Sequence, residues 1–150
     1  MNLTGGCQCG AVRFSAAAVG GASICYCRMC QKAFAAPFGA LVTVKDADLI
    51  WTRGAPTYFQ SSNMVRRGFC AACGTPLTYV ARQAETEVAC CAFDDPNAVT
   101  PRSQLSYETR VGWFDSLGEL PKKTFSGFAA PLISHQHPDH DTTDWPTSHG

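Results

Sequence analysis

The sequence predicts an all-β fold of short antiparallel strands, with at most short helical turns. Short runs rich in β-branched and aromatic residues recur at intervals of roughly 8–12 residues, and Gly, Pro, Asn and Asp separate them. No helical periodicity continues beyond two turns. The 150 residues, of which 45% are hydrophobic, suffice for one domain with its own core.

The first part of the chain is expected to contain two clear strands around a short helical segment. Residues 11–17 (AVRFSAA) alternate as a half-buried strand does, after a turn expected at Gly5-Gly6. Residues 38–44 (FGALVTV) are apolar and β-branched, which predicts a buried strand. Between them, residues 23–25 predict a short strand and residues 28–34 one or two helical turns.

Further short strands are expected along the rest of the domain. Their predicted positions are 49–52, 57–61, 64–69, 77–82, 86–93 and 105–110. Gly, Pro, Ser, Asn and Asp predict the turns between them, at 54–56, 62–63 and 94–97.

A change of composition at Ser134 divides the chain into a domain (1–133) and a tail (134–150). The tail has three Asp, two Pro and no Lys or Arg. Such a segment buries little apolar surface, so we expect a mobile C-terminal tail.

The charge balance argues against nucleic-acid and membrane partners. Lys and Arg total 12, as do Asp and Glu, so the formal net charge is zero. Nucleic acids and anionic membranes both require a basic face. The most apolar stretch, 33–44, is too short to span a bilayer, and the N-terminus lacks a signal-peptide pattern. We therefore expect a cytoplasmic protein.

Nine cysteines are the most informative feature of the sequence. Seven of them fall in three groups, Cys7-x-Cys9, Cys25-x-Cys27-x2-Cys30 and Cys70-x2-Cys73, while Cys90 and Cys91 are adjacent. An odd number of thiols without a secretion signal favours metal ligation over disulfides. We expect Cys90 and Cys91 to be packing residues.

Thiolates, rather than imidazoles, must hold any metal in the domain. All four histidines lie in the tail, at His135, His137, His140 and His149. Seven thiols fit one closed site of four ligands and one site of three, which leaves a coordination position open. The contiguous triplet Cys25, Cys27 and Cys30 is the natural three-ligand set, although by spacing alone Cys27-x2-Cys30 could pair with either other group.

The cysteine segments resemble a known enzyme family. GGCQCGAVRF, CYCRMCQKAFAAPFGA and RRGFCAACGTPLTY are similar, in order and spacing, to the glutathione-dependent formaldehyde-activating enzymes, a family that includes centromere protein V. FDDPNAVTP and TRVGWFDSLGELPK extend the resemblance, which covers about residues 4–125.

The resemblance implies an Mss4-like fold and two zinc ions per chain. It implies that Cys7, Cys9, Cys70 and Cys73 hold a structural zinc, and that Cys25, Cys27 and Cys30 hold a catalytic one. The implied activity is that of a carbon–sulfur lyase or synthase, which adds glutathione or a similar small thiol to formaldehyde or another aldehyde. Tyr26 stands where the family often has His.

Cationic and aromatic residues near the cysteines are candidates for substrate contacts. Arg28 and Arg110 are the predicted substrate-binding residues, because a guanidinium can meet a substrate carboxylate. Lys32 is expected to be solvated, and Trp113-Phe114 to belong to the core. The alternative function is a non-catalytic zinc-binding module for a protein partner.

Overall fold

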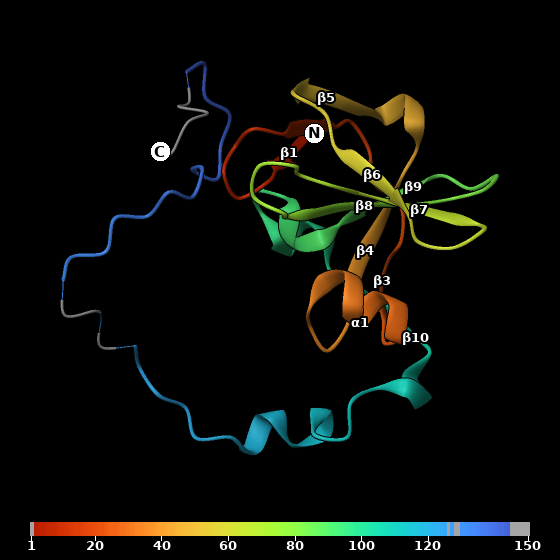
Figure 1. Ribbon diagram of the computed structural model, residues 1–150, viewed down its shortest axis with the longest axis vertical. Helices are drawn as coiled ribbons and strands as arrows, with labels where there is room; N and C mark the ends of the chain where they lie inside the picture. The colour runs from red at the N-terminus through yellow and green to blue at the C-terminus, as the bar shows by residue number, and fades with distance from the viewer. Residues whose placement is uncertain (1, 126, 128–129, 145–150) are drawn as a thin grey trace.

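A computed structural model describes residues 2–125, 127 and 130–144 and shows two β-sheets, which confirms the predicted fold class (Figure 1). The larger sheet has seven strands in the order β10-β3-β4-β9-β8-β7-β6. The smaller sheet has three strands in the order β1-β2-β5. Every neighbouring pair is antiparallel except β10 and β3, which are parallel.

The strands are short, as predicted, and their bounds follow the expected turns closely. In chain order they are β1 (Leu3–Gly6), β2 (Arg13–Ala16), β3 (Ala22–Cys25), β4 (Gly39–Val44), β5 (Leu49–Arg53), β6 (Thr57–Gln60), β7 (Val65–Phe69), β8 (Pro76–Ala81), β9 (Thr86–Ala89) and β10 (Ser103–Leu105).

One α-helix and several 3₁₀ turns complete the fold. Helix α1 (Arg28–Phe34) matches the predicted helical segment and packs on β4. The 3₁₀ turns are Asp46–Asp48, Cys90–Ala92, Pro96–Val99, Tyr107–Thr109 and Phe114–Glu119. No helix among the described residues is both long and apolar enough to cross a bilayer.

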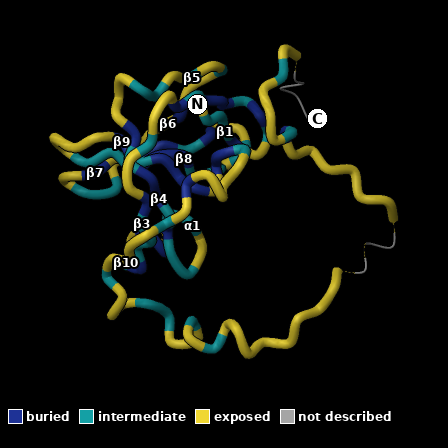
Figure 2. Tube along the Cα trace, turned by 180° about the vertical axis from the view of Figure 1, so that it is seen from behind, coloured by how far each residue is buried: buried dark blue, intermediate teal, exposed yellow. Residues whose placement is uncertain are grey.

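The core lies where the two sheets meet. Phe14 of β2 is fully buried, and its ring meets those of Trp51 and Phe93 edge-on. Val42 and Val88, paired across β4 and β9, are also fully buried. Figure 2 shows the buried residues gathered in the strands, whereas the chain after β10 runs as a largely exposed arc.

The N-terminal strand is where the sequence prediction was wrong. Gly5 and Gly6 lie in β1, paired with β2, and do not form a turn. A Cβ on Gly5 would lie 2.4 Å from the carbonyl oxygen of Ala92 and 2.5 Å from the Phe14 ring. These glycines therefore allow close packing, and close packing leaves no local sequence signal.

Two other predicted strands are shorter than expected. The strand predicted at 86–93 ends at Ala89, where Cys90–Ala92 turns as a 3₁₀ helix. The late strand predicted at 105–110 lies instead at Ser103–Leu105, because Ser106 adopts a left-handed conformation (φ 53°) and begins the turn Tyr107–Thr109.

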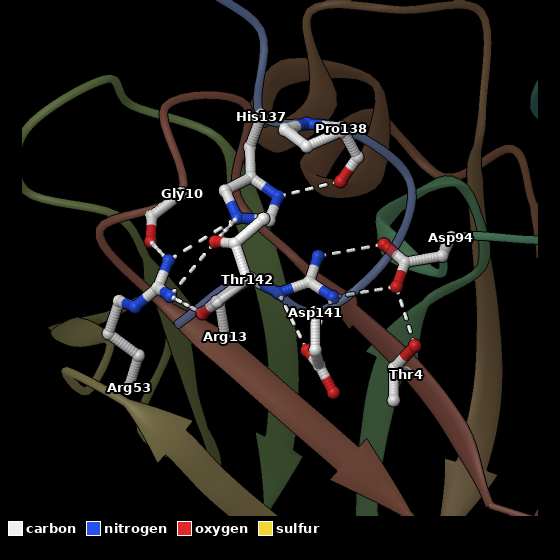
Figure 3. A network of polar contacts seen from close by, with 9 residues as sticks. All are labelled: Thr4, Gly10, Arg13, Arg53, Asp94, His137, Pro138, Asp141 and Thr142. Atoms are coloured by element: carbon white, nitrogen blue, oxygen red, sulfur yellow. Dashed lines mark hydrogen bonds and ion pairs between the residues drawn. The ribbon is translucent and has the colours of Figure 1, made fainter. Parts of the chain in front are cut away.

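The tail packs against the domain instead of being solvated along its length (Figure 3). His137 is only 3% exposed, and its backbone N–H donates to the carbonyl oxygen of Gln8 at 2.7 Å. Arg13, itself 3% exposed, forms ion pairs with Asp94 at 2.6 Å and with Asp141 at 2.7 Å. Composition missed this docking because it depends on a few residues of the domain, among them Arg13 and Arg53, that are distant in the sequence. Residues 145–150 of the predicted tail lie outside the described residues.

Candidate metal centres

Four cysteines from two distant loops form the first cluster. Cys7 and Cys9 lie between β1 and β2, and Cys70 and Cys73 lie between β7 and β8. All four Sγ atoms are within 4.8 Å of one another. The Cys7–Cys9 and Cys9–Cys70 sulfur distances are 3.6 and 3.8 Å. Tetrahedral zinc with Zn–S bonds of ~2.3 Å requires sulfurs about 3.8 Å apart, so the spacing fits such an ion.

Tight turns bring each cysteine pair together. The N–H of Gly74 donates to the carbonyl oxygen of Cys70 at 2.8 Å, and Gly74 has φ +77°, a conformation that glycine adopts readily. In the other loop, Gly10 (φ 75°) donates to the carbonyl oxygen of Cys7 at 3.0 Å. In both loops the chain direction therefore reverses within a few residues.

The environment of these thiols favours a bound cation. Burial raises the pKa of Cys7 to about 12, even though the N–H of Val12 donates to its sulfur at 3.2 Å. Burial also raises the pKa of Cys73, but hydrogen bonds from the hydroxyl and backbone of Thr75 outweigh it and lower the value to about 6. A buried thiol like Cys7 needs a cation beside it to be a thiolate at neutral pH, and a metal ion supplies that charge.

Three cysteines within one loop form the second cluster. Cys25 ends β3, Cys27 is the N-cap of α1, and Cys30 lies in its first turn. Their sulfur atoms are also within 4.8 Å of one another. The sulfur of Cys27 accepts a hydrogen bond from the N–H of Cys30 at 3.4 Å. The same residue therefore caps the helix and presents a ligand.

The pKa values of Cys27 and Cys30 shift in opposite directions. Burial raises the pKa of Cys27, but hydrogen bonds from the N–H of Cys30 and from neighbouring groups outweigh it, so the net shift is downward. Burial raises the pKa of Cys30 to about 12, against the opposing effect of Arg67. Three thiol ligands suit a soft metal ion and leave a fourth position for another ligand.

Tyr26 points away from this cluster into an aromatic group. Its ring is 1% exposed and meets those of Phe38, Tyr107 and Phe114 edge-on. Its hydroxyl donates to Oε1 of Gln104 at 2.7 Å, and burial raises its pKa. Tyr26 is thus a neutral packing residue, and it does not replace a histidine in proton transfer.

A buried glutamine secures the cysteine loop, which the sequence did not reveal. Nε2 of Gln31 donates to the carbonyl oxygens of Tyr26 at 2.7 Å and Thr109 at 3.1 Å. Gln31 therefore ties the loop to the segment after β10. No motif marks this role, because both partners are backbone atoms.

Arg67 is the cation nearest to the second cluster. Its side chain is buried on β7, and Nη2 donates to the sulfur of Cys30 at 3.4 Å. Strand register places Arg67, Tyr79 and Glu87 in a row on one face of the sheet. Arg66 lies over the Tyr58 ring and is exposed. Because side chains alternate along a strand, only one of these two arginines faces the cluster.

The other cationic candidates have partners within the chain. Arg28 is exposed and donates to Oε1 of Gln31 at 3.1 Å. Arg110 pairs with Asp115 at 2.6 Å and stacks on the Tyr107 ring. Contact of Arg28 and Arg110 with substrate stays a prediction.

Several packing predictions hold only in part. Cys90 is 3% exposed, but Cys91 is exposed, so the packing role predicted for Cys91 is wrong. Trp113 is 54% exposed and does not belong to the core, whereas Phe114 packs against Tyr26 and Phe38. None of the nine cysteines forms a disulfide.

A cavity of about 320 Å³ lies between α1 and the β6–β8 region. Arg67 forms part of its wall and also contacts Cys30 of the second cluster. The other side chains around it include Lys32, Phe34, Phe59, Phe69 and Pro76. The cavity therefore combines an apolar lining with two cations, of which Arg67 connects it to the second cluster.

The fold and the two clusters define a small β protein with two cysteine sites able to hold metal ions. The family model of the glutathione-dependent formaldehyde-activating enzyme matches residues 2–109, and the chain belongs to this family. This confirms the resemblance found in the cysteine segments.

A solved structure supports the fold alone. A crystal structure of a Rhodobacter sphaeroides protein, a structural-genomics target, has a TM-score of 0.54 and 22% sequence identity. The match covers 67% of this chain and 98% of that one. No curated protein matches the sequence.

Proposed function

We propose that this protein is a zinc-dependent carbon–sulfur lyase that adds glutathione, or a similar small thiol, to formaldehyde. The proposal rests on membership of the formaldehyde-activating family together with a three-cysteine cluster beside a cavity. With nine cysteines and no disulfide among them, the protein suits a reducing compartment, and we assign it to the cytoplasm.

We propose one zinc ion in each cluster, with different roles. Cys7, Cys9, Cys70 and Cys73 form a closed tetrahedral set, which suits a structural ion. Cys25, Cys27 and Cys30 leave one position open, which suits a catalytic ion. When bound there, zinc supplies an open position that favours the thiolate form of a substrate thiol and polarises a carbonyl oxygen.

The chemistry forms one bond and moves one proton. The substrate sulfur attacks the carbonyl carbon of formaldehyde, the C=O π bond breaks, and a C–S bond forms. The thiol proton ends on the new hydroxyl group, so the product is S-hydroxymethylglutathione. Tyr26 takes no part, because its hydroxyl is bound to Gln104.

We propose that the part of the thiol substrate other than its sulfur binds in the cavity that Arg67 lines. Glutathione carries two carboxylates, and Lys32 is an exposed cation in the cavity wall that can meet one of them. The phenylalanines of the same wall exclude water from the reacting atoms, which strengthens electrostatic interactions there.

Exchange between free and hydroxymethylated glutathione, followed by NMR, tests this function. We expect the zinc-loaded protein to accelerate exchange beyond the rate in buffer and the Cys27→Ser variant to lose the acceleration. Cys91→Ser is the matched control, because Cys91 is exposed and belongs to neither cluster. No acceleration, together with no glutathione binding in calorimetry, would refute the assignment.

A further inference from the structure

The buried guanidinium of Arg67 contacts the three-cysteine cluster directly. Arg67 is 4% exposed, and Nη2 lies 3.4 Å from the sulfur of Cys30. Its Nε donates to the hydroxyl of Ser61 at 3.1 Å, and its Cζ lies 4.9 Å from the centre of the Tyr79 ring. The contacts with Cys30, Ser61 and Tyr79 together hold the guanidinium in one place.

The charge of the cluster gives this contact a consequence. Three thiolates and one divalent ion sum to a single negative charge, and a substrate thiolate entering the fourth position adds a second. Burial makes such an accumulation of charge costly unless a cation offsets it. Arg67 is a buried cation in contact with this cluster. Glu87 lies on the same face of the sheet, and the charge of its carboxylate is opposite to that of Arg67.

We propose that Arg67 is a positioning residue that acts through Cys30 to favour a substrate bound as its thiolate. This inference rests on the proposed function and adds the residue that sets affinity for the anionic form of the substrate. Arg67 also lines the cavity, so one side chain contacts both the cavity and Cys30.

The alternative role for Arg67 is recognition of a substrate carboxylate, and the choice of thiol separates the two. 2-Mercaptoethanol offers a thiol and no carboxylate, while glutathione offers both. An arginine that stabilises bound thiolate affects the two thiols equally. An arginine that binds a carboxylate affects glutathione alone.

The test uses the full chain loaded with Co²⁺, whose absorption reports both the thiolate ligands and the entry of a fourth ligand. Each thiol is titrated into wild type, Arg67→Gln, Arg67→Lys and Arg66→Gln. Arg66 is the matched control, because it is the preceding residue of the same strand but is exposed and stacked on Tyr58. Ser61→Ala, which frees Nε of Arg67 but keeps its charge, serves if Arg67→Gln does not fold.

We expect Arg67→Gln to weaken the binding of both thiols by roughly 10- to 100-fold, the order given by unit charges about 6–12 Å apart at an effective dielectric constant of about 20. Arg67→Lys should recover most of the affinity, Ser61→Ala should lose part of it, and Arg66→Gln should match wild type. The Co²⁺ affinity should change less than the thiol affinity.

Three results would overturn the inference alone: unchanged thiol binding in Arg67→Gln and Ser61→Ala, a loss confined to glutathione, or Arg67→Lys as weak as Arg67→Gln. A wild-type protein whose spectrum does not respond to either thiol would overturn the proposed function, and this inference with it.

Discussion

The seven clustered cysteines differ in what their loss should do. Cys70 joins two loops that are far apart in sequence, whereas Cys27 belongs to a cluster contained within one loop. A structural zinc contributes folding free energy directly, with apparent values of ~10–16 kcal/mol in zinc-finger peptides. Loss of Cys70 should therefore unfold the protein, whereas loss of Cys27 should impair its chemistry.

We predict that Cys70→Ser lowers the thermal stability strongly, while Cys27→Ser gives a folded protein with weaker metal binding and no activity. Thermal melts and metal analysis of freshly reduced protein measure both effects. Cys91→Ser is the control and should match wild type in each. Equal destabilisation by the two cluster variants would contradict the proposed division of roles.

Tyr26 provides a second test at a single residue. Tyr26→Phe removes only the hydroxyl that donates to Gln104 and should cost about 1 kcal/mol of unfolding free energy, with activity retained. Denaturant unfolding measures the cost. Tyr107→Phe is the matched control, because its exposed hydroxyl lies 3.5 Å from Asp115. A large loss of activity in Tyr26→Phe would show that the phenol takes part in the reaction.

The cysteine pattern identified the seven clustered thiols, and the family resemblance divided them into two sets, but neither identified the side chains around them. The spacing of thiols is a local signal, since metal geometry sets the distance between ligands. Arg67 and Gln31 act across the fold, on Cys30 and on the carbonyl oxygens of Tyr26 and Thr109. Their roles depend on strand order and register, which a single sequence does not specify.

At the level of elements, helix α1 and the loop before it depend on one buried side chain. Gln31 is 6% exposed and donates to two backbone oxygens. We predict that Gln31→Ala lowers the unfolding free energy by about 1–3 kcal/mol, because it removes two hydrogen bonds to backbone carbonyl groups. Denaturant unfolding and Co²⁺ titration measure the effects on the fold and on the second cluster.

Met29→Ala is the matched control, because Met29 lies in the same helix and is 53% exposed. We expect it to change neither stability nor metal affinity appreciably. Unaltered stability in Gln31→Ala would mean that the loop is held by the cysteines alone.

Strands with alternating side chains could be predicted from the sequence, whereas the strand that contains two adjacent glycines was missed. The run 38–44 became β4 because its apolar, β-branched residues form the buried centre of the larger sheet. Gly5 and Gly6 carry no side chain to alternate, so β1 was mistaken for a turn. The predicted strand 105–110 failed because one left-handed residue, Ser106, turns the chain.

Across the whole molecule, the tail returns to the domain through a few polar contacts (Figure 3). Asp141 joins Arg13 at 2.7 Å, and Arg53 donates to the hydroxyl of Thr142 at 3.1 Å. We predict that Asp141→Asn loosens this docking. Hydrogen exchange at the His137 amide, which donates to Gln8, should become faster. Asp144→Asn, at an exposed position of the same segment, should leave the exchange unchanged.

The docked tail should also depend on pH. Burial lowers the pKa of His137 below its ordinary value of 6.5, and the charges of Arg13 and Arg53 lower it further, against a backbone hydrogen bond and Asp94. A group whose pKa falls on folding stabilises the folded form fully above its unfolded pKa and loses that contribution as pH decreases. Tail docking should therefore weaken below about pH 6.5.

Asp94 should not contribute until the solution is more acidic. Burial raises its pKa, but hydrogen bonds from Arg13 and Thr4 outweigh burial and lower it below the ordinary value of 3.8. Proteolysis of the tail between pH 7 and 5 therefore isolates His137. His137→Gln should remove the pH dependence and His140→Gln should keep it, whereas a pH dependence that persists in His137→Gln would rule out this origin.

The two clusters also differ in when they become complete as the chain is synthesised. Cys25, Cys27 and Cys30 leave the ribosome together, and closing so short a loop costs little entropy. The first cluster needs Cys9 and Cys70, which are 61 positions apart, so it is assembled only after most of the domain has been translated. The cluster of Cys25, Cys27 and Cys30 can therefore bind a metal ion while the chain is still being synthesised. The four-cysteine cluster can bind one only after the sheets have formed.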